Sequence, residues 1–220
     1  MNVTEAVNRR ASIRAFRPDP VPASVVREIL ALAARAPSGG NLQPWKVYAL
    51  AGEPLAALKA ITAANPPEPE PEFQSYPADL WEPLRSRRSR IGEEMYATIN
   101  VAREDRAGRL AQFARNGQLF GAPVGLFFCL DRRCGPPQWA DVAMMMNSVM
   151  LLALERGLDT CPQRYWSNYG QTLRRFLDLP DTEMVCSGMA LGYRDESAPI
   201  NSLRSSRDPL ETWAELRGFD

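Results

Sequence analysis

The apolar residues of the chain recur with a helical period in some segments and form short continuous runs in others. From residue 23 to residue 36 they return every three or four positions, at a spacing that suits one helix face. The residues of that face are Val25, Ile29, Leu30, Leu32, Ala33 and Ala36. Residues 138–156 are apolar nearly all round, which indicates a helix that is central or lies at a subunit interface. Helices are predicted for residues 2–8 (capped by Thr4), 23–36, 55–65, 84–118, 138–156, 167–178 and 210–217.

Strands are predicted from shorter runs of apolar residues. Residues 124–130 are apolar without interruption, which is the pattern of a strand buried on both faces. The predicted strands cover residues 46–51, 124–130, 158–163 and 184–193.

Segment 66–83 has a different composition. Its run of alternating proline and glutamate cannot hold a helix or a central strand. The segment also carries Phe73, Tyr76 and Trp81. Two interpretations stay open at this point: an acidic spacer in solvent, or a lid over a substrate pocket.

The connection between the helix at 23–36 and the strand at 46–51 is a candidate ligand loop. It reads Pro37-Ser38-Gly39-Gly40-Asn41-Leu42-Gln43-Pro44-Trp45. Pro37 stops the helix, and the small or polar residues after it tolerate unusual backbone angles. Such a loop can bring bare backbone against a flat ligand, although a plain helix-to-strand turn would have the same composition.

A second candidate lies near the N-terminus, where Arg9, Arg10 and Arg14 surround Ser12. Guanidinium groups and a hydroxyl suit a phosphate, and each charge-assisted hydrogen bond contributes about 1.5–3 kcal/mol. The C-terminal segment 202–210 brings arginine and serine back. The alternative for both segments is a basic surface in solvent.

Composition excludes several kinds of chemistry. The chain has 220 residues and no histidine, which removes Ser-His-Asp and Cys-His catalysis and imidazole metal sites. A borrowed reactive group therefore becomes more plausible. The four cysteines lack metal-site spacing and are interpreted as reduced and mostly buried.

The charge and the hydropathy of the chain argue against nucleic acid and membrane as partners. Lys+Arg and Asp+Glu each number 26, so the formal net charge is zero and nothing points to nucleic acid. No apolar run is long enough to span a bilayer, and no apolar signal segment opens the chain. We therefore expect a cytoplasmic protein that binds neither nucleic acid nor membrane.

Together, the arginine segment 9–14 and the loop 37–45 resemble the flavin-dependent nitroreductase family. That family opens with Arg-(Arg or His)-Ser-(hydrophobic)-Arg, followed by Pro-Ser-x-x-Asn-x-Gln-Pro-Trp, and both motifs occur here in order. Thr160-Cys161-Pro162-Gln163 is similar to the nitrobenzoate-reductase branch. The resemblance implies an α+β fold, with a central mixed, mainly antiparallel sheet flanked by helices, in a dimer. It also implies one domain over residues 1–220, with the 66–83 loop or lid inside it.

The resemblance assigns flavin mononucleotide (FMN) to matched positions. Arg10 would hold the phosphate, and Arg14 would lie towards the ribityl chain and the pyrimidine edge. The loop at 37–41 would contact the flavin of the partner subunit, and residues 162–165 would pass their backbone beside N5. The implied cofactor-binding residues are Arg10, Ala11, Ser12, Arg14, Pro37, Ser38, Gly39, Asn41, Gln163, Arg164, Tyr165, Ser205 and Arg207.

Some positions depart from the family pattern. Ala11 replaces a larger, often basic residue, and Gly39 replaces the commoner serine. Arg164-Tyr165 stands where several members have Glu-Gly, and Ser205 stands where some carry lysine. These differences bear on phosphate geometry and substrate preference.

The implied activity is an FMN-dependent oxidoreductase. NADH or NADPH would reduce the flavin, and a nitroaromatic or quinone-like acceptor would then take the electrons, with no protein residue as acid or base. The expected partners are a second copy of the chain and a small aromatic acceptor. The alternatives are flavin breakdown or reductive dehalogenation on the same fold, or a flavin-binding protein without turnover.

Overall fold

The computed structural model describes residues 1–219 of the chain and contains a four-stranded sheet. The strands are β1 (Lys46–Ala51), β2 (Val124–Asp131), β3 (Asp159–Gln163) and β4 (Glu183–Gly192). Their order is β1-β2-β4-β3, and each neighbouring pair is antiparallel. A single parallel bridge joins Ser12 to Thr160 of β3. The predicted mainly antiparallel sheet is confirmed, and β3 lies at its edge.

Strand β2 divides the core into two clusters. Leu126 and Phe128 point to one face of the sheet, and Phe127 and Cys129 point to the other, because side chains alternate along a strand. All four side chains are fully buried. The strand is therefore covered on both faces, as its unbroken apolar run predicted.

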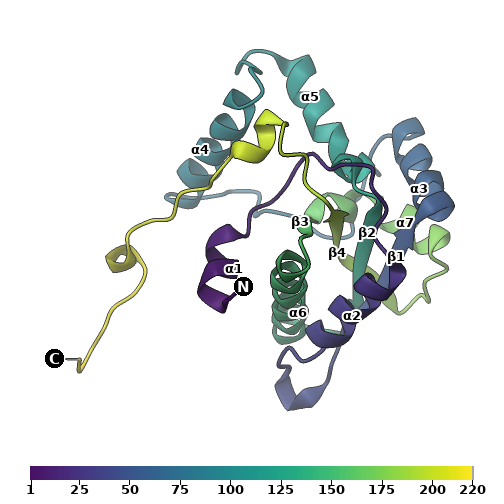
Figure 1. The fold of residues 1–220 in the computed structure, drawn as a ribbon, viewed down its shortest axis with the longest axis horizontal. Coiled ribbons are helices and arrows are strands. Elements are labelled where there is room, and N and C mark those ends of the chain that lie inside the picture. Colours follow the sequence, from purple (N-terminus) through teal and green to yellow (C-terminus); the bar gives the residue numbers. More distant parts are fainter. Residues whose placement is uncertain (220) are drawn as a thin grey trace.

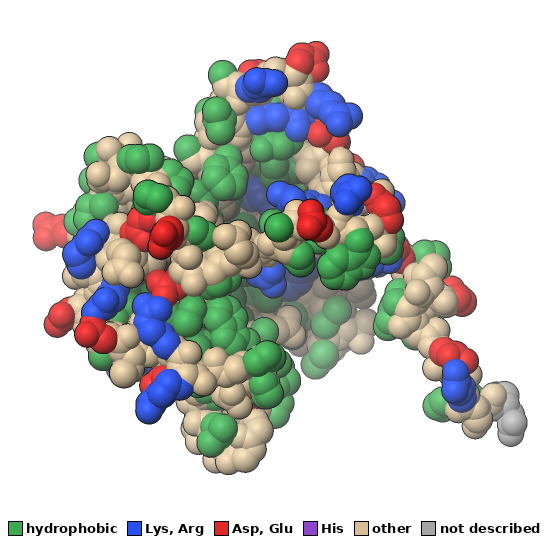
Figure 2. All heavy atoms as spheres, turned by 180° about the vertical axis from the view of Figure 1, so that it is seen from behind, with side chains coloured by type: hydrophobic (Ala, Val, Ile, Leu, Met, Phe, Trp, Pro, Cys, Tyr) green, Lys and Arg blue, Asp and Glu red, His purple; other side chains and the backbone are tan. Residues whose placement is uncertain are grey.

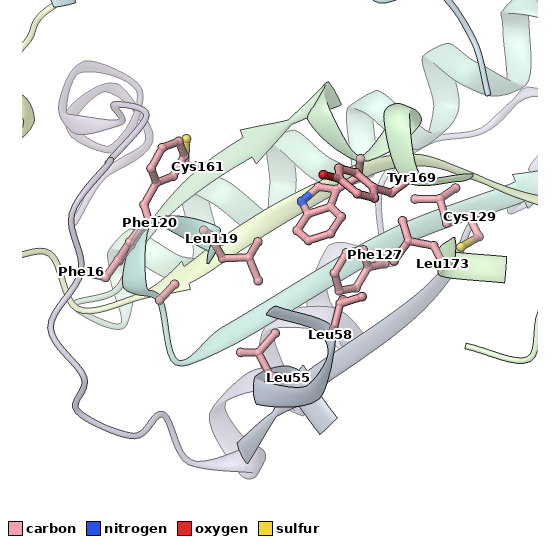
Figure 3. Packing of buried hydrophobic residues seen from close by; sticks show 14 of the residues in the cluster. Phe16, Leu55, Leu58, Leu119, Phe120, Phe127, Cys129, Cys161, Tyr169 and Leu173 are labelled. Carbon is pink, nitrogen blue, oxygen red and sulfur yellow. The ribbon is translucent and has the colours of Figure 1, made fainter. Parts of the chain in front are cut away.

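Helices cover both faces of the sheet (Figure 1). On one face lie α2 (Ala23–Ala33) and α6 (Pro136–Glu155). On the other lie α3 (Gly52–Ala64) and α7 (Gly170–Phe176), with Leu55 and Leu58 of α3 close to Phe127 of β2 (Figure 3). Helices α4 (Leu84–Ala97) and α5 (Arg106–Ala114) project from this body, and α1 (Val3–Arg9) opens the chain.

Several predicted element boundaries were wrong. Asn2, not Thr4, caps α1, since its side chain accepts from the Glu5 N–H at 2.8 Å. Helix α2 ends at Ala33 and buries Val26, Ile29 and Ala33, whereas Leu32 is 44% exposed. Ile29 and Ala33 of the predicted face are thus buried as expected, Val26 is buried beside them, and Leu32 lies outside the buried stripe.

The predicted helix at 84–118 is two helices and a 3-10 segment (η2, Arg115–Gly121). Asn100 adopts a φ of 55°, and the Asp105 side chain caps α5 by accepting from Gly108 N–H at 2.9 Å. The predicted helix at 167–178 is a 3-10 segment (η3, Arg164–Tyr169) followed by α7. The predicted helix at 210–217 is only a turn, Leu210–Thr212.

Segment 66–83 forms neither helix nor strand and is tied to the body by its glutamates. The Glu68 carboxylate accepts from the N–H groups of Gln171 and Thr172 at 3.0 and 2.7 Å, at the start of α7. Glu72, only 5% exposed, pairs with Arg132. The segment is therefore docked against the body, which is unlike an acidic spacer in solvent.

Candidate functional site

Residues 10–16 run in an extended conformation beside the edge strand β3. The Ile13 N–H donates to the Thr160 carbonyl at 3.0 Å, and the Arg14 N–H donates to Asn201 Oδ1 at 2.8 Å. Ile13 and Ala15 are buried, so the alternate side chains of Ser12 and Arg14 face the other way. Because side chains alternate in direction along this segment, those of the arginine motif point into a cleft.

That cleft, about 560 Å³ in volume, joins the two ends of the chain. The arginine segment forms one wall, and the C-terminal segment 203–207 forms the other. Its lining residues are Val7, Asn8, Arg10, Ala11, Ser12, Arg14, Ile91, Leu203, Arg204, Ser205 and Arg207. None of them is acidic. Figure 2 shows Lys and Arg side chains gathered around the hollow between the body and the C-terminal segment.

Positive charge is concentrated in this cleft by three neighbouring guanidinium groups, those of Arg10, Arg204 and Arg207. Burial lowers the pKa of the Arg10 guanidinium, and repulsion from Arg207 and Arg204 lowers it further. Within residues 1–219, none of the three forms an ion pair with a carboxylate. An anion bound between them would relieve the repulsion and supply the missing charge.

Sequence reasoning missed Arg204. The Arg-Ser composition of the C-terminal segment was the available signal, but only the fold shows that Arg204 lies near Arg10. Its Nη1 donates to the Arg9 carbonyl at 3.0 Å, which joins the C-terminal segment to the end of α1.

The neighbouring Asp208 holds the C-terminal segment in place. It pairs with Arg87 of α4, and Arg90 lies 3.7 Å from its second oxygen. Arg207 Nη1 meanwhile donates to Ser205 Oγ at 2.8 Å. Helix α4 thus neutralises Asp208, and among the described residues Arg207 has no acidic partner.

Farther along the same edge of the sheet, strand β3 ends with Pro162 and Gln163. The Thr160 carbonyl faces outward to Ile13, so the Pro162 carbonyl faces outward too, and proline adds no N–H there. The Gln163 side chain is buried and donates to the Asn116 carbonyl at 2.9 Å. Its amide therefore supports the interior, and the residue as a whole is only 3% exposed.

The turn after β3 is fixed by a tryptophan against a glycine. The Trp166 ring lies so close to Gly188 of β4 that an added Cβ would come within 2.2 Å of it. Trp166 is fully buried and donates through Nε1 to Gln163 Oε1 at 3.4 Å. This packing turns Arg164 and Tyr165 towards the surface.

A second cleft, about 510 Å³ in volume, opens at this end of β3. It contains the predicted Gln163, Arg164 and Tyr165. Its remaining walls are Pro71 and residues 73–77 of segment 66–83, Arg88 of α4, Phe113 of α5, Asn116, Pro162 and Asn168. The Phe113 and Tyr165 rings meet edge to face at 5.3 Å. The sequence did not indicate Arg88 or Phe113, because helices α4 and α5 could not be placed from it.

The loop at 37–41 lines neither cleft of the single chain. Gly40 and Asn41 adopt φ values of 57° and 55°. Ser38 Oγ accepts from the Gln43 N–H at 3.0 Å, and the Gly39 N–H donates to Asp141 of α6 at 3.3 Å. One chain therefore does not bring Pro37, Ser38, Gly39 and Asn41 to the arginine cluster.

The described part of the chain has neither a bilayer-crossing helix nor a cluster of metal ligands. In residues 1–219, no helix has both the length and the apolar character needed to cross a bilayer. Over the same range, cysteine and acidic side chains form no cluster that could hold a metal ion. The four cysteines are unpaired, and three of them are buried while Cys134 is partly exposed.

The profile of the nitroreductase family matches residues 7–193, so the chain belongs to the nitroreductase family. The expected resemblance is thereby confirmed. Among curated relatives, 4-nitrobenzoate reductase from Pseudomonas putida is 38% identical over 97% of this chain and 95% of its own. The chloronitrobenzene nitroreductase from Comamonas testosteroni is 37% identical over 95% and 94%.

A solved structure confirms the predicted nitroreductase-like α+β fold. The FMN and NADPH-dependent nitroreductase NfnB from sphigopyxis sp. strain HMH superposes with a TM-score of 0.95. It is 43% identical to this chain, and the match covers 100% of both.

Proposed function

We propose that the chain is an FMN-dependent oxidoreductase that passes electrons from NADH or NADPH to nitroaromatic or quinone-like acceptors. Membership of the nitroreductase family and the two nitroarene-reducing relatives support this activity. The observation that carries it is the cleft where Arg10, Arg204 and Arg207 face one another without an acid. It shares the edge of β3 with the second, aromatic cleft.

The residues of the first cleft fit FMN. A dianionic phosphate needs two or three guanidinium or hydroxyl partners, and Arg10, Ser12 and Arg207 have these groups. Arg204 joins this set, and Ser205 and Arg14 complete the polar wall. When bound, FMN supplies a redox ring that links a nicotinamide donor to an electron-poor acceptor in two successive half-reactions.

The role of the chain itself is to bind and orient the flavin ring and the aromatic acceptor. The backbone of residues 162–165 would border the ring, because the Pro162 carbonyl faces the outer edge of β3. In the second cleft, Phe73, Phe113 and Tyr165 would cover an aromatic acceptor and exclude water. No histidine is available to move protons, so the acceptor takes them from solvent or cofactor.

The working unit in this proposal is a homodimer. The loop at 37–41 lies away from both clefts of its own chain, so its family role needs a second copy. The exposed residues Met144, Trp213 and Leu216 give a partner apolar surface to cover. We further propose that residues 1–220 act as one domain, with 66–83 as a lid, in the cytoplasm.

Purification with added FMN tests this function. We expect a yellow protein that NADH or NADPH bleaches under anaerobic conditions and that a nitroarene recolours. A chain that binds no FMN would contradict the proposal, and so would bound FMN that neither donor reduces. Destruction of the flavin in air without an acceptor would instead favour flavin breakdown.

A further inference from the structure

We propose that the second cleft selects an anionic aromatic acceptor, a nitroarene with a carboxylate, through Arg88 and Arg164. This inference rests on the proposed function. It names the substrate class, which the relatives leave open because one acts on a nitrobenzoate and another, almost as similar, on a chloronitrobenzene.

Two guanidinium groups meet at one short stretch of the lid. Arg88, from α4, lies over the Tyr76 ring with 4.2 Å between its guanidinium carbon and the ring centroid. Arg164, at the end of β3, donates through Nη1 to the Ser75 carbonyl at 3.4 Å. Because Ser75 and Tyr76 are adjacent, these contacts bring two charges that are far apart in sequence to the same wall of the cleft.

Both charges lack an acidic partner. Of the residues that line this cleft, none in the described chain is acidic. Other arginines nearby are neutralised: Arg87 pairs with Asp208, and Arg109 pairs with Glu93 at 2.6 Å. Two of the lid glutamates are occupied too, since Glu72 pairs with Arg132 and Glu68 caps α7, and neither lines this cleft. Arg88 and Arg164 are thus left for an anion that comes from outside the chain.

The rest of the cleft suits a flat ring. Phe73, Tyr76, Phe113 and Tyr165 line it, together with Pro71, Pro77 and Pro162. Tyr165 is braced by its hydroxyl contact to Tyr169 at 3.2 Å and by its edge-to-face contact with Phe113. Aromatic walls with two guanidinium groups at one side fit an aryl carboxylate, whose ring packs while its charge is paired.

The second cleft also lies beside the place where the flavin ring would pass electrons to the acceptor. Its Pro162-Gln163 wall belongs to the strand edge that carries the predicted FMN contact, whereas the Arg164 side chain reaches the Ser75 carbonyl on the lid side. A carboxylate held at the lid side would direct the opposite end of the ring, and a para nitro group on it, towards that edge. The arginines would then set orientation as well as affinity.

Binding and turnover test the inference on the FMN-loaded enzyme. The probes are benzoate and benzamide, titrated by calorimetry, and 4-nitrobenzoate and 4-nitrobenzamide as acceptors. Each pair has nearly the same shape and differs in charge. In the wild-type enzyme we expect tighter binding of benzoate and a higher kcat/KM for 4-nitrobenzoate.

The variants Arg88→Gln and Arg164→Gln should each lower the acid-to-amide ratio about tenfold, both in affinity and in kcat/KM, because each loses a charge-assisted contact in a partly exposed site. Arg88→Lys should keep much of the ratio, since it keeps the charge. Arg106→Gln removes one charge from α5 outside the cleft and should leave the ratio unchanged.

Three results would overturn the inference. They are a wild-type enzyme that prefers the amides, equal losses for acid and amide in both variants, and a rise in KM for NADPH alone. The last would assign the arginines to the phosphate of the donor. Benzoate binding needs no turnover, so an enzyme that binds benzoate but reduces no nitroarene would contradict only the proposed function.

Discussion

Arg194 and Asp159 form a bidentate ion pair that fastens the edge strand to its neighbour. Arg194 Nε lies 2.7 Å from Asp159 Oδ2, and Nη2 lies 2.5 Å from Oδ1. The two side chains are 14% and 8% exposed. Asp159 opens β3 and Arg194 follows β4, so this contact sets the position of the strand beside which both clefts lie.

Replacing Arg194 with glutamine should destabilise the protein by about 3 kcal/mol, because it leaves the Asp159 carboxylate buried without its partner. Urea unfolding measures this cost. The double variant Arg194→Gln/Asp159→Asn should cost less than the sum of the two single variants. Arg217→Gln, which breaks an exposed pair with Glu215, is the matched control and should change little. Similar losses for Arg194 and Arg217 would contradict the assignment.

Replacing Arg10 with alanine should weaken FMN binding about tenfold to a hundredfold, the effect of one lost charge-assisted contact. Fluorescence titration of the apoprotein measures the affinity. Arg9→Ala is the control, since that side chain is exposed and outside the cleft. Unchanged affinity in Arg10→Ala would remove the phosphate assignment.

Inorganic phosphate should raise the thermal unfolding temperature of the FMN-free protein, because an anion relieves the repulsion among Arg10, Arg204 and Arg207. Chloride at equal ionic strength is the control for general screening. Removing Arg204 should reduce the phosphate effect. A phosphate effect that is the same in Arg204→Ala would show that the anion binds elsewhere.

Replacing Glu68 with alanine should free the lid. The variant removes the acceptor for two N–H groups at the start of α7, a loss of about 1–2 kcal/mol by analogy with helix capping. Amide hydrogen exchange over residues 66–83 should become faster, and the KM for the acceptor should rise. Glu70→Ala removes an exposed carboxylate of the same segment and should leave exchange as it is. Equal protection in both variants would show that Glu68 does not hold the lid.

Stability should be nearly constant around neutral pH and should fall in alkali. The chain has no histidine to titrate near pH 7. Burial raises the pKa of Cys161 from 9.0 to about 11, against the opposing effect of Arg14 and Arg10. Above pH 9 the unfolded thiol loses its proton and the folded one keeps it, so stability decreases between about pH 9 and 11. Burial also raises the thiol pKa of Cys129 and of Cys186, so these two residues lower stability above pH 9 as well. Cys161→Ala should therefore make the decrease in urea-unfolding stability between about pH 9 and 11 less steep without abolishing it, and an unchanged slope would contradict the assignment.

The sequence predicted the sheet well because its strands are short apolar runs with clear ends. Strand β1 begins and ends where expected, and the buried run at 124–130 is β2. The break between α4 and α5 was missed, although Asp105 followed by Gly108 is a local capping signal. The helix at 210–217 was wrong because the described chain covers little of Trp213 and Leu216, which are 69% and 62% exposed.

The site was predictable where it depends on local order. Arg10, Ser12 and Arg14 lie on one side because an extended backbone alternates, so the motif alone sufficed. Arg204, Arg88 and Phe113 reach the clefts only through contacts between distant segments, which no local pattern encodes. The roles of Pro37, Ser38, Gly39 and Asn41 stay predictions, because they concern a second copy of the chain.

Pro162 also has a consequence for solubility. An open strand edge is a template on which other chains can add strands, and β3 is such an edge. Ile13 covers the Thr160 carbonyl, and the proline interrupts the row of donors beyond it. Pro162, whose carbonyl faces the outer edge of β3, thus also protects the strand edge against aggregation while the cofactor is missing, as in a newly made chain.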